Sequence, residues 1–289
     1  MTVDPGTSYD REIDWLDAGI RYARECADRP VYATVAIADG CLRYTDPERN
    51  SLLDLIADSV SARGVDGVYI VVEQGGEATE SRQCSNFRTL ASLLHLIHLL
   101  ARDSGLSVAV NFVGSFGLVC IAAGANLWAS GWYKSQYRMR LADAIAGGRA
   151  FPSYWSHLAA SDLSLDEDFD NLVAARLLGC FQDHTNASAG LLQAARSGNR
   201  VSDVPPWRYA QSNVTTCSEH FFLSSIAATT RLSNLPESQR LPSVEQWLTQ
   251  AVSNTQQVAR RLGSSPKTKI GHVRGWLDAL LHYRRTHNV

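Results

Sequence analysis

The sequence lacks the features that would direct the protein to a membrane or, through overall charge, to nucleic acid. Acidic and basic residues nearly balance, with a formal net charge of −2, so no global field draws the protein to phosphate backbones or anionic lipid. No uninterrupted apolar run approaches the roughly 20 residues of a membrane-spanning helix. The start of the chain carries early acids and no apolar run behind a basic segment, unlike a secretory signal. We therefore expect a cytoplasmic protein with no membrane partner.

The common cofactor and catalytic motifs are also missing. The six cysteines are far apart, with no CxxC pair and no Cys/His group at zinc spacing, so we interpret them as small buried residues in a reducing compartment. No GxSxG, GxxxxGKS/T, GxGxxG or HExxH occurs, which removes the commonest hydrolase, nucleotide, dinucleotide and zinc-protease interpretations. We expect neither a metal ion nor an organic cofactor.

The first half of the chain alternates short apolar runs with helical patterns. The runs are apolar on both faces, as in strands of a parallel sheet that helices cover. An amphipathic helix over 13–23 precedes them. The predicted strands cover 31–37, 68–72, 108–113 and 126–129, and the predicted helices cover 50–62, 89–104 and 118–123.

The sequence predicts an α/β protein with parallel strands like those of a TIM barrel, in an incomplete barrel, and a helical C-terminal half. Strand patterns vanish after about residue 140, and helices are expected near Leu191 and over 217–229, 244–262 and 275–285. An open half-barrel has two unprotected edges, so the helical half covers them or a second copy or partner chain completes the sheet. The predicted regions are a polar lead with a helix (1–29), a β/α half-barrel (30–145) and a helical region (146–289).

Polar residues follow the second and third apolar runs, where parallel α/β proteins bind ligands. Glu73 and Gln74 come directly after the second run. An unpaired carboxylate is costly to bury there, so Glu73 is either a catalytic or substrate-binding group or part of a structural salt bridge. Asn111 lies inside the third run. The turn at 114–117, with Ser115, either offers backbone N–H groups to an anion or only permits a tight connection.

Aromatic and basic residues crowd together after the fourth run. Rings interleaved with cations can stack a nucleobase and hold its phosphates, and the alternative is aromatic packing between the two halves. A further excess of cations in 255–289 fits contacts to nucleic acid or a solvated helix face. The crowded residues are Trp128, Trp132, Tyr133, Lys134, Tyr137, Arg138 and Arg140, continued by Tyr154 and Trp155.

Histidines form one pair at helical spacing. His95 and His98 are three residues apart on a very apolar helical stretch, a spacing that can bind a metal ion, but the sequence identifies no third ligand nearby. Single histidines elsewhere can donate protons and are more often structural. We therefore expect no metal site here.

Three segments follow one another in the order found in a known family. Residues 65–70 have the sequence VDGVYI, and VNFVGS at 110–115 is followed by AAGANLW at 122–128. These resemble the FDGYAI segment and the YLMGVG to GIDMFD stretch of the tRNA-guanine transglycosylase superfamily, which includes queuine and archaeosine enzymes and DNA-modifying relatives. The resemblance covers about residues 30–140.

The resemblance implies chemistry at a glycosidic bond. Such enzymes attack C1′ with an aspartate while a flipped base is held in a pocket. Ala129 stands at the position that resembles the nucleophile, and the family's zinc ligands have no counterpart. Glu73 is then the carboxylate left at a strand end, where it can activate water.

The sequence therefore predicts a base-modifying enzyme that cleaves or exchanges the N-glycosidic bond of a modified nucleobase in DNA or RNA. Removal of ordinary bases would damage the host. The alternatives are an enzyme for a small phosphorylated or carbonyl substrate and a non-catalytic interaction subunit of a transglycosylase-like complex. Glu73 is the predicted catalytic acid/base, Gln74, Asn111 and Ser115 line the substrate site, Trp132 and Tyr133 stack the base, and Lys134 and Arg138 bind flanking phosphates.

Overall fold

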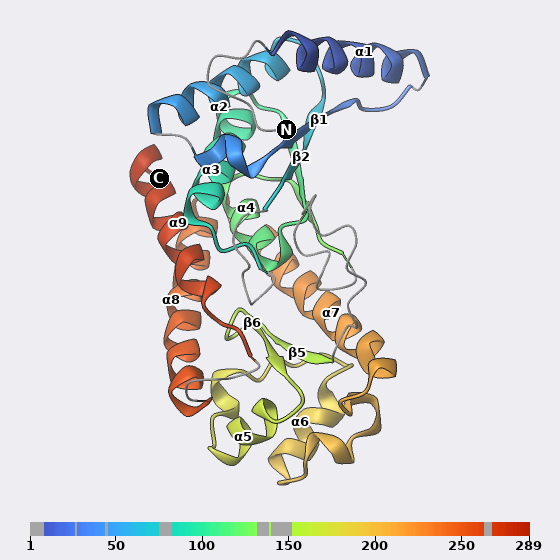
Figure 1. The fold of residues 1–289 in the computed structure, drawn as a ribbon, viewed down its shortest axis with the longest axis vertical. Helices are drawn as coiled ribbons and strands as arrows, with labels where there is room; N and C mark the ends of the chain where they lie inside the picture. Colours follow the sequence, from blue (N-terminus) through green and yellow to red (C-terminus); the bar gives the residue numbers. More distant parts are fainter. Residues whose placement is uncertain are drawn as a thin grey trace.

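The first half of the protein is a parallel β/α unit (Figure 1). The computed structural model describes residues 9–26, 28–43, 46–74, 83–131, 139, 152–262 and 268–289. Four strands follow the order β1-β2-β3-β4, and every neighbouring pair is parallel. They are β1 (Tyr32–Ile37), β2 (Gly67–Val72), β3 (Ser107–Asn111) and β4 (Leu127–Ala129).

Helices connect the strands on one face of this sheet, because consecutive parallel strands joined by right-handed crossovers place all their connections on the same side. Val68, Ile70 and Val72 of β2 are at most 1% exposed and form part of the core beneath these helices. The predicted parallel half is thus confirmed, while the described residues form no closed barrel. The connecting helices are α2 (Asp46–Ser61), α3 (Phe87–His98), which continues as a π-helical turn (Leu99–Asp103), and α4 (Gly117–Ala123).

Helix α1 (Asp10–Cys26) precedes β1 and projects from the body of the molecule (Figure 1). Only Ile20 of this helix is buried. An ion pair between Arg63 and Asp17, with an N–O distance of 2.5 Å, joins α1 to the end of α2. A large part of α1 is consequently exposed.

The second half contains a hairpin that the sequence analysis did not predict. Strands β5 (Ser153–Ser156) and β6 (Ser161–Ser164) pair antiparallel, so the prediction of an all-helical region was wrong. Both strands are short and begin and end in serine, and neither carries the β-branched run that marks the strands of the first half. The hairpin packs with α5 (Asp168–Ala174) and α6 (Ala189–Arg196) around a second core that includes Tyr154 and Trp207.

Long helices join the two units (Figure 1). Helix α8 contacts α4 of the first unit and α5 of the second, and α9 packs on α3 and α8. The helices predicted for this half are confirmed at their predicted positions. No described helix is long and apolar enough to span a membrane. The long helices are α7 (Val214–Ser233), α8 (Glu237–Leu262) and α9 (His272–His287).

Candidate functional site at the carboxyl ends of the strands

Strand β2 brings Glu73 to the carboxyl end of the sheet. The Glu73 N–H donates to the Ile37 carbonyl over 2.8 Å, which continues the pairing of β1 and β2 by one residue. Side chains alternate between the faces of a strand, so Glu73 follows Tyr69 and Val71 on the face opposite the connecting helices. Its side chain is half-buried. The carboxylate therefore lies at the carboxyl end of the sheet, as the sequence predicts.

Gln74 and Asn111 both bind the backbone of Phe112. Gln74 is 9% exposed, and its Nε2 donates to the Phe112 carbonyl over 2.9 Å. The Phe112 N–H donates to Asn111 Oδ1 over 2.7 Å, and Asn111 Nδ2 donates to the Tyr69 hydroxyl. Phe112 has φ 59°, a left-handed conformation that is strained for a bulky residue. The two predicted site residues thus hold a strained turn at the end of β3.

Three buried polar atoms at this edge have no hydrogen-bond partner among the described residues. They are Gln74 Oε1, Ser115 Oγ and Ser130 Oγ, which follow β2, β3 and β4 respectively. An unsatisfied buried polar atom costs about 1–3 kcal/mol, so each of these three atoms requires a partner beyond the described residues, such as a water or a ligand group. The glutamine oxygen accepts hydrogen bonds, and the hydroxyls both donate and accept. With Glu73 and Asn111, these residues form what we call the strand-end site.

The turn after β3 is closed by packing. Gly114, Ser115 and Phe116 form a buried 3-10 turn, and a Cβ atom on Gly117 would overlap the indole ring of Trp128. That ring is held by a hydrogen bond of 3.0 Å from Nε1 to Thr229 Oγ1. Helix α4 has only seven residues. These contacts favour the tight-connection interpretation of the turn over an anion site.

Substitution of Gly117 by alanine is expected to destabilise the protein by about 1–3 kcal/mol, because the new methyl group overpacks against a fixed ring. Gly19→Ala is the matched control, since Gly19 lies in helix α1 and nothing lies within 4 Å of its Cβ position. That change is expected to be neutral or to stabilise by up to about 1 kcal/mol. Urea unfolding measures both, and equal stability of the two variants would contradict the packing interpretation.

The aromatic residues near the site are partly structural. Trp128 packs between the sheet and α7, and Tyr154 and Trp155 are at most 1% exposed. The buried rings of Tyr154 and Trp155 are not open to stack on a base, so for them the packing alternative holds, whereas the ring of Trp128 is half-buried. The predicted base-stacking and phosphate-binding residues Trp132, Tyr133, Lys134 and Arg138 lie outside the described residues, as do Tyr137 and Arg140.

His272, which was not among the predicted site residues, begins α9 and is 1% exposed. Its Nε2 donates to the Ala160 carbonyl over 2.9 Å, and Nδ1 has no partner among the described residues. Burial lowers the pKa of His272 to about 4, so the ring is neutral at pH 7. Trp276 packs on both His272 and Phe116, with ring centroids 4.8 and 5.7 Å apart. The indole of Trp276 thus lies between His272 and the turn after β3, and no local sequence pattern marks this histidine.

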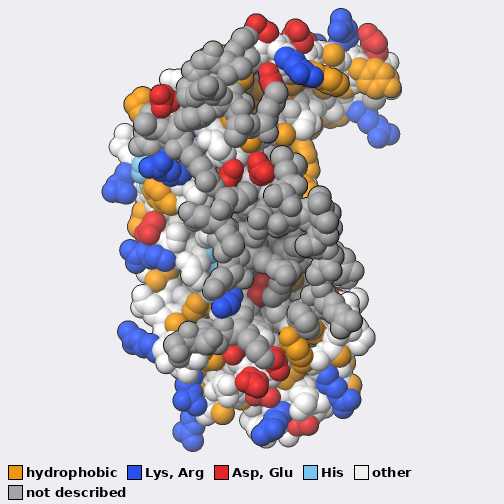
Figure 2. Space-filling view, in the orientation of Figure 1, with side chains coloured by type: hydrophobic (Ala, Val, Ile, Leu, Met, Phe, Trp, Pro, Cys, Tyr) orange, Lys and Arg blue, Asp and Glu red, His pale blue; other side chains and the backbone are white. Residues whose placement is uncertain are grey.

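Arginines of the basic C-terminal segment are partly neutralised by neighbouring carboxylates. Arg274 pairs with Asp278 over 3.0 Å, and Arg284 pairs with Glu245. On the face shown in Figure 2, Lys and Arg side chains are spread along the side of the molecule and do not gather in one patch. For these arginines the solvated-face interpretation is favoured.

Comparisons assign this chain to no family: no protein-family model, curated protein or solved structure matches it. Among the described residues, no three His, Cys, Asp or Glu side chains are arranged to hold a metal ion.

Proposed function

We propose that the strand-end site binds a modified nucleobase and that the protein cleaves or exchanges its N-glycosidic bond. The supporting observation is the set of unpaired buried atoms Gln74 Oε1, Ser115 Oγ and Ser130 Oγ at three neighbouring strand ends. A nucleobase edge carries hydrogen-bond donors and acceptors in one plane. Such an edge can pair with the glutamine oxygen, which accepts, and with the two serine hydroxyls, which donate or accept. The resemblance of residues 30–140 to the transglycosylase superfamily also supports chemistry at a glycosidic bond.

Hydrolysis is the favoured reaction within this proposal. Glu73 takes a proton from water, the resulting hydroxide bonds to C1′, the C1′–N bond breaks, and the leaving base nitrogen receives a proton from Glu73. Ala129 pairs in register with Asn111 and offers no nucleophile, so a covalent enzyme intermediate at that position is excluded. Release of free base by water is therefore expected over exchange.

Binding of nucleic acid is the first test of this proposal. The protein is titrated with single- and double-stranded oligonucleotides at several salt concentrations. We expect the logarithm of the affinity to fall linearly with the logarithm of the salt concentration, because Lys134 and Arg138 are proposed to release counterions from flanking phosphates. Absence of binding at low salt would overturn the nucleic-acid assignment and favour a small substrate.

A second candidate function, as an interaction subunit, is supported by the open edge of β1. A cavity of about 730 Å³ lies over β1 between α1 and α2. We call it the β1 groove; the surface is hollowed below α1 in Figure 2, and hydrophobic side chains gather there. The carbonyls of Val31 and Ile37 accept hydrogen bonds from the N–H groups of Asp66 and Glu73, on the side of β2. Because successive residues of a strand alternate in direction, the N–H and C=O groups of Tyr32, Thr34 and Ala36 face the groove.

We propose that a second copy of the chain occupies the β1 groove by pairing its own β1 there. Two equal edges of six residues related by a twofold axis form a closed, self-complementary interface. Such pairing also removes the exposed sheet edge, which proteins otherwise have to protect. The resulting sheet has eight strands.

Trp15→Glu is expected to convert the proposed dimer into a monomer, because Trp15 is 72% exposed and lines the β1 groove. Tyr22→Glu is the matched control, since Tyr22 lies on the same helix, is 69% exposed and does not line the groove. Light scattering coupled to size exclusion gives the mass of each variant. A monomeric wild-type protein at micromolar concentration would exclude the second copy as the occupant.

A further inference from the structure

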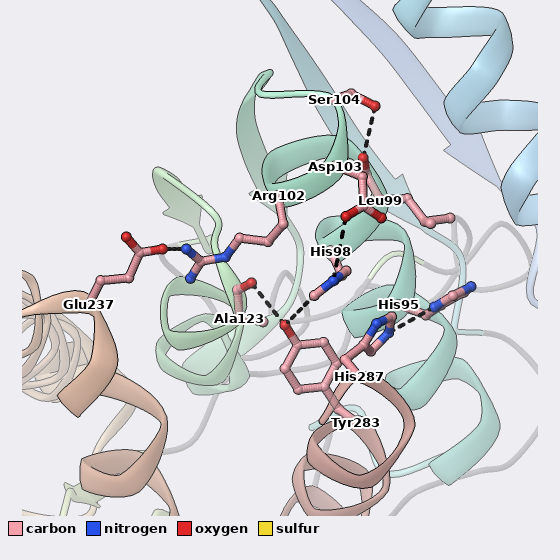
Figure 3. A network of polar contacts seen from close by, with 10 residues as sticks. All are labelled: His95, His98, Leu99, Arg102, Asp103, Ser104, Ala123, Glu237, Tyr283 and His287. Atoms are coloured by element: carbon pink, nitrogen blue, oxygen red, sulfur yellow. Dashed lines mark hydrogen bonds and ion pairs between the residues drawn. The ribbon is translucent and has the colours of Figure 1, made fainter. Parts of the chain in front are cut away.

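Three histidine rings meet where the end of α9 packs against α3 (Figure 3). His95 Nδ1 and His287 Nε2 are 2.9 Å apart, and the ring of His98 stacks on that of His287 with centroids 3.7 Å apart. His98 Nδ1 lies 2.9 Å from the Tyr283 hydroxyl, which donates to the Ala123 carbonyl over 3.2 Å. His287 is separated from the other two by about 190 residues of sequence, so it is the third member that the sequence did not reveal.

The hydrogen bonds fix where protons can be added. The bond between His95 and His287 needs one N–H and one lone pair, so the cluster is intact only while at least one of the two rings is neutral. The Tyr283 hydroxyl donates its proton to the Ala123 carbonyl and therefore accepts a hydrogen bond from His98 Nδ1. The atom of His98 that titrates is then Nε2, which lies 3.7 Å from Asp103 Oδ1.

Charged groups of both signs surround the cluster. Asp54 and Arg49 face it from α2, Arg102 and Asp103 from the turn after α3, and His282 from α9. Arg102 is also paired with Glu237. Burial is the largest influence and lowers the pKa of His95 and of His98. Burial, together with the two neighbouring imidazoles, lowers the pKa of His287 to about 4.

We propose that His95, His98 and His287 form a proton-sensitive latch that holds the last turn of α9 on α3 at neutral pH and releases it in acid. A proton on the imidazole that accepts in the His95–His287 bond removes the lone pair that the bond requires. If His98 and His287 are both protonated, two positive charges lie on stacked rings whose centroids are 3.7 Å apart. In the released turn, His287 is hydrated and regains an ordinary pKa near 6.5, so release takes up protons and is favoured as the pH falls below about 6.5.

Hydrogen exchange of the C-terminal peptide tests the latch. After correction for intrinsic exchange, we expect protection of residues 283–288 to fall at least tenfold between pH 7.5 and pH 5. His287→Phe keeps an aromatic ring and removes one titrating group of the cluster, so protection of residues 283–288 in this variant is expected to fall less with acid than in the wild type. His282→Phe is the control on the same helix and is expected to behave as wild type.

Two results would overturn the latch. One is wild-type protection of residues 283–288 that does not change with pH. The other comes from the wild-type protein alone, by NMR titration of the imidazole C2 protons, and so is independent of how the variants fold. We expect His287 to titrate well below 6.5, and titration at its ordinary value would contradict the proposal.

Discussion

Glu73→Gln is expected to lower the rate of base release by about 10²–10⁴-fold, the usual contribution of a general acid or base. The amide keeps the size of the carboxylate but cannot take a proton from water. Glu73 is half-buried at the carboxyl end of β2, and the proposal places it beside a base held by Gln74, Ser115 and Ser130. Base release from a modified oligonucleotide, followed by mass spectrometry, measures the effect.

The control for this variant is Glu219→Gln, which makes the same chemical change at an exposed position of α7. Wild-type activity is expected for it. Both variants are expected to bind the oligonucleotide as the wild type does, because the substitution affects the reaction and leaves the buried hydrogen-bonding atoms in place. Glu73→Gln with full activity would reject Glu73 as the acid/base.

Acidification from pH 7 to pH 5 is expected to destabilise the protein by several kcal/mol. Burial lowers the pKa of both His157 and His272 to about 4, whereas an unfolded histidine has a pKa near 6.5. Between these values the unfolded chain binds more protons than the folded chain, so stability falls as the pH falls. The complete loss amounts to about 3 kcal/mol for each residue, which is large against a typical stability of about 5–15 kcal/mol.

His272→Gln provides the specific check on this pH dependence. The glutamine amide can still donate to the Ala160 carbonyl that accepts from His272, but it does not titrate. In urea unfolding at pH 5–7, we expect the wild-type free energy of unfolding to change by about 1.4 kcal/mol per pH unit for each buried histidine at the steepest point. The variant is expected to lose the contribution of one residue. A wild-type free energy that is flat over this range would contradict the assignment of neutral buried imidazoles.

The strands of the parallel sheet could be predicted because their residues are apolar on both faces. The run at 68–72 contains β-branched residues without a charged interruption, and it became β2, which begins one residue earlier and ends at the same residue. The β5–β6 hairpin could not be predicted in the same way. Its strands are four residues long and contain serine and aspartate, so antiparallel pairing within a compact second unit determines them, and local propensity does not.

Only the position of the candidate site in the fold could be predicted from the sequence. Parallel strands bring their carboxyl ends to one edge, which is why Glu73, Gln74, Asn111 and Ser115 could be named from their positions after strands. The hydrogen bonds of these residues could not be predicted. In the structure, the side-chain amides of Gln74 and Asn111 both bond to the backbone of Phe112. His272 comes from a helix more than 150 residues further along the chain, and such distant contacts leave no trace in local spacing.

Incubation of the wild-type protein with modified DNA, unmodified DNA and tRNA, followed by mass spectrometry of the free bases, shows whether the strand-end site breaks a glycosidic bond. We expect a free modified base from at least one of these substrates, in an amount that grows with time and protein concentration. Binding of nucleic acid without release of any base would leave the strand-end site without its proposed chemistry and overturn the proposed function.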